Sequence, residues 1–331
     1  MKKLIVLATL AALPAAAMAD VVISGNLAVG IVNTKASGSG SVTTENRTSG
    51  ELKFAGKEDL GNGLKSIWQI ATRINLADTP SDHKNNNWAS RESFVGLTGD
   101  FGTLTLGNLY HMPTSGAMAI FENNSATYAS DLYDQGDYTN NSIAYKSPSV
   151  AGFTATVHHS FGKQRKDVND QLDPSQNGDA ESEKAHQQSL SLAYEGEGFS
   201  VSYDGQRSKD VTNDKTSKLH ELNGSVSLDA LTLMAGYAHG KDSDGDKRSG
   251  YGIAASYALG NITPKFGFWK EGDAKLANGT KVNDGHKAYA LGAEYALSKR
   301  TRAGAELTKV NYDDNTKADV RGFSVYLGTK F

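Results

Sequence analysis

The chain has 331 residues, including 35 glycines, 6 prolines and no cysteine, and its formal net charge is −3. The absence of cysteine excludes disulfide bonds, thiolate zinc sites and cysteine nucleophiles. The mild charge argues against a nucleic-acid-binding protein, and the plentiful tyrosine, phenylalanine and β-branched residues argue against disorder.

The first segment, residues 1–19, has the pattern of a secretory signal peptide. Lys2 and Lys3 precede an apolar stretch over residues 4–13, and Ala17-Met18-Ala19 forms an A-x-A cleavage site. The apolar stretch is short for a membrane anchor. We therefore expect a mature chain that starts at Asp20 and forms a single domain over residues 20–331, with 32 basic and 37 acidic residues.

From Asp20 onward, hydrophobic and polar residues alternate with a period of two, which is the pattern of β-strands with two different faces. Sixteen such segments occur, from "VVISGNLAVGIV" at the start to "VRGFSVYLGTKF" at the end. Each is close to the length that crosses a bilayer at a tilt. No apolar run after the signal reaches the length of a membrane helix.

The connections between these segments alternate in length. One set is tight, as in "DLGNG", "GDFG", "EGEG" and "LSKR", whereas the other is long and polar, as in residues 110–140 and 162–186. Short turns at one rim and long loops at the other are typical of outer-membrane barrels. The expected fold is therefore all-β: a 16-stranded antiparallel transmembrane β-barrel, a size that leaves an aqueous channel.

Strand phase predicts which charges face the lumen, because a charge on the lipid face costs about 2–4 kcal/mol at the midplane. If Leu52 and Phe54 face lipid, Lys53 and Lys57 face the lumen. If Trp68 and Ile70 face lipid, Arg73 faces the lumen. With Phe94 outward, Arg91 lies inward or near it. We expect these four basic residues on the pore wall.

Several stretches resemble the general porins of Gram-negative outer membranes, close to the neisserial and other β-proteobacterial type. The most specific is "GKEDLGNGLKSIWQI". The others are "SRESFVGLTGDFGTLTLG", "NSIAYKSPSVAGF", "GNITPKFGF" and "YALSKRT", in the family's order along the chain.

This resemblance implies a homotrimer whose channels pass ions and small hydrophilic solutes. It also implies that the third long loop folds into the lumen, where acidic residues face a basic wall. On this loop the candidates for the constriction are Glu122, Asp131, Asp134 and Asp137, with Glu122 and Asp131 preferred. Implied partners are outer-membrane lipid, lipopolysaccharide and the outer-membrane assembly machinery. The threefold contact is expected near both termini and the early strands, with the second loop (residues 78–87) latching a neighbour.

The chain departs from the family where relatives often carry basic wall residues, since it has Ala28, Asn108 and Ala144 there. With acids in excess over bases, we expect weak ion selectivity, tilted toward cations.

The last strand should close the barrel against the first. Val325, Leu327, Thr329 and Phe331 share one face, and Tyr326, Gly328 and Lys330 the other. We expect Phe331 in the aromatic girdle at the short-turn rim. The resemblance implies that it also serves as an assembly signal.

No motif for enzymatic chemistry holds up, and we expect no catalytic residue, metal or cofactor. "HELNG" lacks the second histidine of a zincin. "DSDGD" at residues 242–246 starts like a calcium loop, but its twelfth position is Ile253. Two alternative functions share the same barrel: a substrate-specific channel, and a surface adhesin or immune ligand that uses the long loops.

Overall fold

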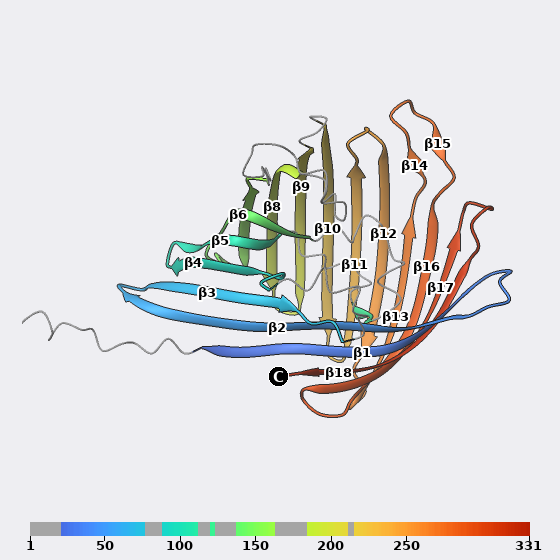
Figure 1. Ribbon diagram of the computed structural model, residues 1–331, viewed down its shortest axis with the longest axis horizontal. Coiled ribbons are helices and arrows are strands. Elements are labelled where there is room, and N and C mark those ends of the chain that lie inside the picture. The colour runs from blue at the N-terminus through green and yellow to red at the C-terminus, as the bar shows by residue number, and fades with distance from the viewer. Residues whose placement is uncertain (1–20, 77–87, 112–119, 123–136, 163–183, 211–214) are drawn as a thin grey trace, which may run out of the picture.

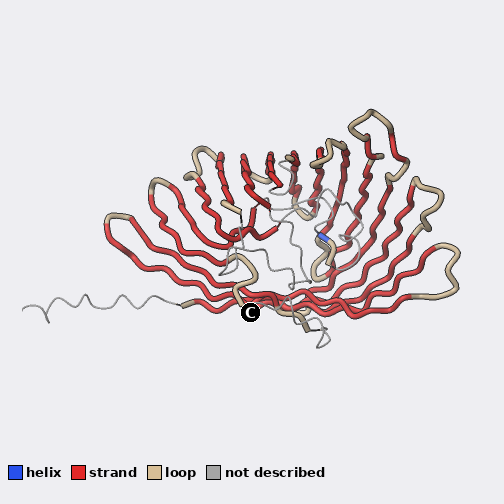
Figure 2. Tube along the Cα trace, turned by 45° about the horizontal axis from the view of Figure 1, so that its top comes forward, coloured by secondary structure: helices blue, strands red, loops and turns tan. Residues whose placement is uncertain are grey.

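The computed structural model describes residues 21–76, 88–111, 120–122, 137–162, 184–210 and 215–331, and the remainder of the chain is grey in Figures 1 and 2. The described chain is built almost entirely of β-strands. None of its described residues belongs to a helix long and apolar enough to cross a membrane.

Eighteen strands follow one another along the described chain. Their bounds are β1 Val22–Ala36, β2 Thr43–Gly61, β3 Leu64–Arg73, β4 Ser93–Gly99, β5 Gly102–His111, β6 Asp137–Lys146, β7 Phe153–Ser160, β8 Lys184–Gly196, β9 Phe199–Asp210, β10 Thr216–Leu228, β11 Leu231–Lys241, β12 Lys247–Tyr257, β13 Ile262–Glu271, β14 Ala274–Lys275, β15 Lys281–Val282, β16 His286–Ala296, β17 Thr301–Tyr312 and β18 Val320–Lys330.

These strands form one antiparallel sheet that closes on itself. Strand β1 pairs with β2 on one side and with β18 on the other, as Figure 1 shows. Strands β14 and β15 have two residues each and form a hairpin in the connection between β13 and β16, which pair directly. Without this hairpin the wall has sixteen strands, which confirms the predicted barrel.

The turns at one rim are short. The turn between β2 and β3 contains Asn62 and Gly63, both with positive φ (53° and 78°). Two successive positive φ values match the twist of the flanking strands, and Asn-Gly adopts them readily. At the opposite rim most connections are longer, although the one between β1 and β2 is short because β1 runs to Ala36 and β2 starts at Thr43.

The outer face of the wall is apolar. Its exposed side chains include Val95 (66% exposed), Leu291 (57%), Leu307 (54%) and Leu327 (54%). On the same strands the alternate residues Glu306, Ser324 and Tyr326 are buried on the inner side. An apolar exterior around a polar interior is the arrangement that a bilayer requires of a β-barrel.

Aromatic side chains gather near both rims. At the long-loop side, Phe268 packs between Tyr251 and Tyr289, with ring centroids 6.2 Å and 5.2 Å apart. At the short-turn side, Tyr194 packs between Phe153 and Phe199, at 4.5 Å and 5.4 Å. Two such girdles mark the two membrane–water interfaces of an outer-membrane barrel.

The expected phase of Phe94 is wrong. In the register of β3 and β4, Gln69 lies opposite Phe94 and Trp68 lies opposite Val95. Directly opposed residues of an antiparallel pair project on the same face. Val95 therefore shares the outer face with Trp68, and Phe94 shares the inner face with Gln69. The alternation along β4 is shifted by one residue from the expected one.

The closure between the first and last strands follows the expected faces. Val29 lies opposite Leu327 and Ile31 opposite Val325, all on the outer side. The final residue extends the ladder, since the backbone nitrogens of Gly25 and Phe331 each donate to the other's carbonyl, at 3.0 Å and 3.1 Å. The chain end is thus part of the sheet.

Candidate pore constriction

Residues 120–122 lie inside the barrel, in the long connection between β5 and β6. A short helical turn at Ile120 is visible as the blue segment within the ring of strands in Figure 2. Phe121 is only 4% exposed. It belongs to a buried apolar cluster on the inner wall, with Leu219, Ala238, Trp269, Ala288, Ala290 and Val310. This cluster holds the segment against one side of the lumen.

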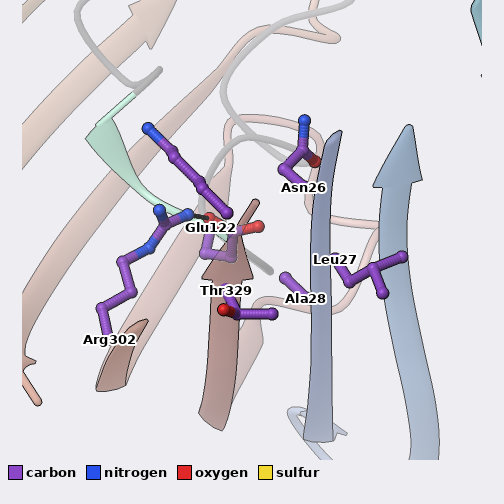
Figure 3. Close-up of a pocket in the computed structure, with 7 residues that line it drawn as sticks. Asn26, Leu27, Ala28, Glu122, Arg302 and Thr329 are labelled. Atoms are coloured by element: carbon purple, nitrogen blue, oxygen red, sulfur yellow. Dashed lines mark hydrogen bonds and ion pairs between the residues drawn. The ribbon is translucent and has the colours of Figure 1, made fainter. Parts of the chain in front are cut away.

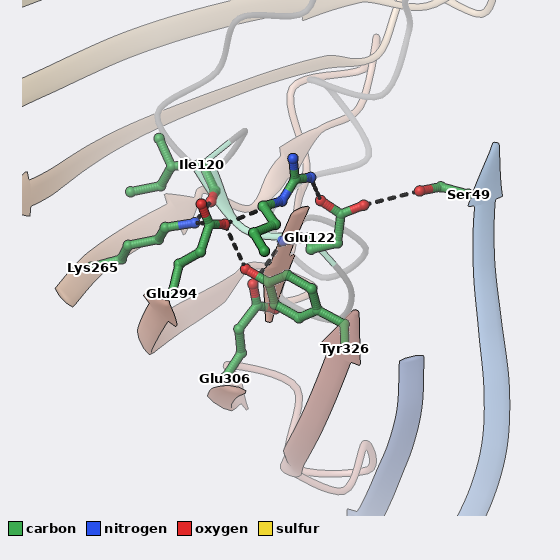
Figure 4. Close-up of polar contacts among 8 residues, drawn as sticks. Ser49, Ile120, Glu122, Lys265, Glu294, Glu306 and Tyr326 are labelled. Carbon is green, nitrogen blue, oxygen red and sulfur yellow. Dashed lines mark hydrogen bonds and ion pairs between the residues drawn. The ribbon is translucent and has the colours of Figure 1, made fainter. Parts of the chain in front are cut away.

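Glu122 follows the anchored Phe121 and contacts two separate strands, β2 and β17 (Figure 4). Its carboxylate accepts from Arg302 Nη2 at 2.5 Å and from the Ser49 hydroxyl at 2.9 Å. Its backbone nitrogen donates to the Glu306 carboxylate at 2.7 Å. Ser49 is on β2, whereas Arg302 and Glu306 are on β17, so the side chain reaches between two parts of the wall.

Glu294, on β16, connects the other polar groups of this network. Its Oε2 accepts from Lys265 Nζ at 3.1 Å and from the Tyr326 hydroxyl at 2.9 Å, and lies 3.2 Å from Arg302 Nε. Lys265 also donates to the Ile120 carbonyl at 2.9 Å. Both ends of the 120–122 segment are therefore tied to charged residues of β13 and β17, which Glu294 of β16 joins to one another.

The two carboxylates Glu122 and Glu294 and the two cations Arg302 and Lys265 form a chain of ion pairs. None of the four side chains is more than 27% exposed. Ion pairs in partly buried surroundings are screened less by salt than surface pairs. The arrangement sets opposite charges side by side in the lumen, which can orient passing polar solutes.

A pocket lies beside this network, between the chain ends (Figure 3). It is lined by Asn26, Leu27, Ala28, Glu122, Arg302, Thr329 and Lys330. In the strand register Gly328 lies opposite both Ala28 and Arg302. Because Gly328 has no side chain, Arg302 extends over it toward Ala28. The guanidinium of Arg302 therefore supplies a positive charge beside Ala28, where relatives often carry a basic wall residue.

Three of the four predicted wall residues lie on the inner face. Lys53 and Lys57 are four and eight residues from Ser49 along β2 and therefore share its face, and Ser49 contacts Glu122 in the lumen. Arg73 lies opposite Glu51, which in turn pairs with Lys53 at 3.0 Å. No described contact joins these three residues to Glu122.

The remaining predicted residues are not brought to this network in the described structure. Arg91 lies over the Tyr138 ring, 5.2 Å from its centroid. Asp137 starts strand β6. Asp131 and Asp134, the signal segment 1–19 and the second loop at residues 78–87 lie outside the described residues.

Arg302, Lys265, Glu294, Glu306 and Tyr326 were not identified from the sequence. A phase signal existed for Arg302, because it alternates with Ala303, Ala305 and Leu307, which the register places outward. The pairing of Arg302 with Glu122 is separated by 180 residues along the chain, and no local pattern reports such a contact.

The described residues contain no group of three or more metal-ligating side chains that could hold an ion. In the "DSDGD" loop, the Asp242 carboxylate accepts from the backbone nitrogens of Asp244, Gly245 and Asp246, at 2.9 Å each. That carboxylate closes a turn.

A closed sixteen-stranded barrel with an apolar exterior and charged groups across its lumen defines a diffusion channel of the outer membrane. The chain matches the model of the Gram-negative porin family over residues 5–315. It belongs to this family, and it forms a water-filled channel for passive diffusion of ions and small hydrophilic solutes in the outer membrane. Family membership indicates a channel rather than an enzyme.

Relatives support this assignment. The major outer membrane protein P.IB of Neisseria meningitidis serogroup A is 30% identical over 321 residues, covering 92% of this chain and 91% of the relative. The corresponding protein of Neisseria lactamica is 31% identical over 335 residues, with the same coverage.

Solved structures share the fold. An anion-selective porin from Comamonas acidovorans superimposes with a TM-score of 0.72 at 19% identity, covering 95% of this chain and 100% of the other. OmpF of Salmonella typhi in complex with daunomycin gives a TM-score of 0.75 at 16% identity, covering 95% and 98%.

Proposed function

We propose that Glu122 and Arg302 form the narrowest charged part of this channel, and that the channel is weakly ion-selective with a tilt toward cations. The observation that carries the proposal is the 2.5 Å ion pair between the inserted segment and the wall. The electric fields of two opposite charges largely cancel at distances greater than the separation between them. The constriction therefore orients polar solutes without strongly favouring one sign of ion.

Asp131, Asp134 and Asp137 are proposed as further acidic residues of the same loop, and Lys53, Lys57, Arg73 and Arg91 as wall cations facing them. The inner-face register of Lys53, Lys57 and Arg73 supports this role. These wall cations would act on a passing solute across the lumen, without direct contact with the loop.

We further propose that the protein is exported with cleavage after Ala19 and assembles as a homotrimer. A solved structure of OmpT, an outer membrane protein of Vibrio cholerae with the same fold, is described as a trimer form. The proposed partners are lipopolysaccharide and the outer-membrane assembly machinery, which would recognise the unfolded chain through Phe331.

Reconstitution into a planar bilayer under a KCl gradient tests the selectivity. We expect discrete channel openings and a small reversal potential with the sign of cation preference. A strong anion preference would contradict the proposed selectivity. A purified, folded protein that never opens a channel would contradict the channel function itself.

A further inference from the structure

The outer face of the barrel carries a row of basic residues at the long-loop rim. Nine strands that are consecutive around the wall, from β9 through β13, then β16 to β18 and β1, contribute one each. We call this row the basic belt, and it consists of Arg207, Lys218, Lys241, Lys247, Lys270, Lys287, Lys309, Arg321 and Lys35. Each lies within three residues of the long-loop end of its strand.

The register shows that these residues face outward. Lys309 is two residues from Leu307, and Arg321 is two residues from Phe323, both of which are exposed on the outer face. Lys270 lies opposite Tyr251, which is 48% exposed on the same face. Residues two apart on a strand, or directly opposed across an antiparallel pair, share a face.

Within the belt, like charges stand directly opposite one another. Six register pairs join two cations: Lys35 with Arg321, Arg321 with Lys309, Lys287 with Lys270, Lys247 with Lys241, Lys241 with Lys218, and Lys218 with Arg207. Directly opposed like charges destabilise a sheet. Six such pairs in one row call for a counter-charge.

The described protein does not supply that counter-charge. Acidic residues of these strands, namely Asp204, Glu221, Glu271, Glu294 and Glu306, are on the inner face. Two aspartates of the adjoining loops are engaged elsewhere: Asp284 pairs with Arg248, and Asp319 accepts from the Tyr312 backbone nitrogen. No belt residue forms an ion pair with a described residue.

The belt lies where a bilayer changes from hydrocarbon to headgroups. Directly beside it is the aromatic girdle, since Tyr289 lies opposite Lys309 and Tyr251 lies opposite Lys270. Lysine and arginine near the end of a membrane-spanning element extend their charged groups to the interface. The counter-charge at this height must therefore come from the surrounding membrane.

We propose that the basic belt binds the phosphate groups of lipid headgroups in the leaflet at the long-loop side. This deepens the proposed partnership with lipopolysaccharide and rests on it. Ammonium and guanidinium groups are strong partners for phosphate, and a polybasic row gains attraction from each charge near an anionic surface. A second copy of this chain is a poor occupant of β9 to β17, because the threefold contact is expected near both termini and the early strands.

The outer face of β2 to β7 provides an internal contrast. Among the described positions of these strands, every lysine and arginine is in inward register, as for Lys53, Arg73 and Lys146. This is also the side where the early strands are expected to contact neighbouring subunits. Outward basic residues thus avoid the early strands β2 to β7, and most of the belt, from β9 to β17, lies away from both the early strands and the chain ends.

The test compares two full-length variants with the same charge change. The belt variant is K270Q/K287Q/K309Q/R321Q. The control variant is K275Q/K281Q/K299Q/R300Q, which removes three lysines and one arginine from exposed positions outside the wall face. Binding of diphosphoryl lipid A to each detergent-solubilised protein is measured by native mass spectrometry, with dephosphorylated lipid A and inorganic phosphate as further probes.

We expect saturable binding of diphosphoryl lipid A to the wild type and to the control, and binding at least about tenfold weaker in the belt variant. Dephosphorylated lipid A should bind the wild type as weakly as diphosphoryl lipid A binds the belt variant. Equal binding by belt and control variants would overturn the proposal. Displacement of the lipid by millimolar inorganic phosphate would show a general anion site and overturn the commitment to lipid headgroups.

A second readout separates this role from simple misfolding. In a zwitterionic detergent the belt variant should be at least as heat-stable as the wild type, because opposed like charges have been removed. In bilayers that contain diphosphoryl lipid A it should be less stable than the wild type. If the belt variant and the wild type have the same relative heat stability in detergent and in bilayers with diphosphoryl lipid A, the proposal is contradicted. Single-channel conductance should stay at the wild-type value, so a failed channel assay would count against the proposed function alone.

Discussion

At the residue scale, the ion selectivity of the proposed constriction depends on the pairing of Glu122 and Glu294 with Arg302. Arg302 neutralises Glu122 at 2.5 Å and lies 3.2 Å from Glu294. These contacts bring together an inserted loop and two wall strands. Removal of either partner therefore changes the charge that a passing ion meets.

The variant R302Q should raise cation preference, and E122Q should lower it. In the first case Glu122 loses its cation and Glu294 keeps only Lys265, and in the second a guanidinium loses one of its carboxylates. We expect reversal potentials in a KCl gradient to move in opposite directions, by several-fold in permeability ratio. The variant K299Q, at a short turn, should leave the ratio unchanged. Shifts of the same sign for E122Q and R302Q would contradict the proposed constriction.

A second residue-scale prediction concerns the seam between the chain ends. A Cβ on Gly25 would lie 2.5 Å from the Glu51 carbonyl oxygen and 2.6 Å from Phe331 Cζ. We expect G25A to displace the terminal ring and lower barrel stability by roughly 1–3 kcal/mol, as overpacking does. The measurement is the heat-induced loss of the folded band on a gel.

The matched control for G25A is G224A. A Cβ on Gly224 has its nearest neighbour at 3.5 Å, which is ordinary contact. Equal stability of the two variants would show that packing of the Phe331 ring against Gly25 does not contribute to barrel stability.

At the scale of elements, one anchored segment sets the shape of the lumen. Phe121 is buried in an apolar cluster on the inner wall, and Glu122 is tied to β2 and β17. Such a cluster is unusual inside a water-filled barrel, because inner faces of large barrels are polar. Its presence indicates that apolar packing, together with the ion pairs, holds residues 120–122 in place.

The variant F121A should loosen residues 120–122, because deleting a buried phenylalanine ring removes packing worth about 3–5 kcal/mol. We expect noisier single-channel currents and faster uptake of larger solutes in liposome swelling. The variant F153A, which removes an outer-face ring that is 61% exposed, should leave both unchanged. Current noise equal to that of the wild type would show that Phe121 does not hold the loop.

At the scale of the whole molecule, charges are sorted by face. Nine of the 32 basic residues after Ala19 face outward in the basic belt, while the acidic residues of the same strands face the lumen. The lumen therefore has more acid relative to base than the composition indicates. This sorting is a physical reason for the proposed tilt toward cations.

The expected threefold contact can be tested with single cysteines, because the natural chain has none. Val95 on β4 is 66% exposed on the side expected to face other subunits, and Leu291 on β16 is 57% exposed beside the belt strands. A spin label on V95C should be immobilised in bilayers, whereas one on L291C should remain mobile. Equal mobility at the two positions would contradict the expected contact face.

The local pattern of the sequence determined the wall of this protein. Period-two alternation and the alternation of short and long connections predicted sixteen strands, the closing strand and the inner-face positions of Lys53, Lys57 and Arg73. A period of two is a property of neighbouring residues, and a lipid-facing charge is costly enough to keep it strict. The error at Phe94 arose where a strand begins, since a shift of one residue reverses every face.

Only the tertiary structure decided the constriction and the basic belt. Glu122 meets Arg302 across 180 residues of chain, and the belt takes one residue from each of nine strands. Neither arrangement has a local signature, because each depends on how barrel closure and strand register bring distant residues to one height and one face. The sequence alone therefore determined that a channel forms, while closure of the sheet decided which charges meet in the lumen and which face the membrane.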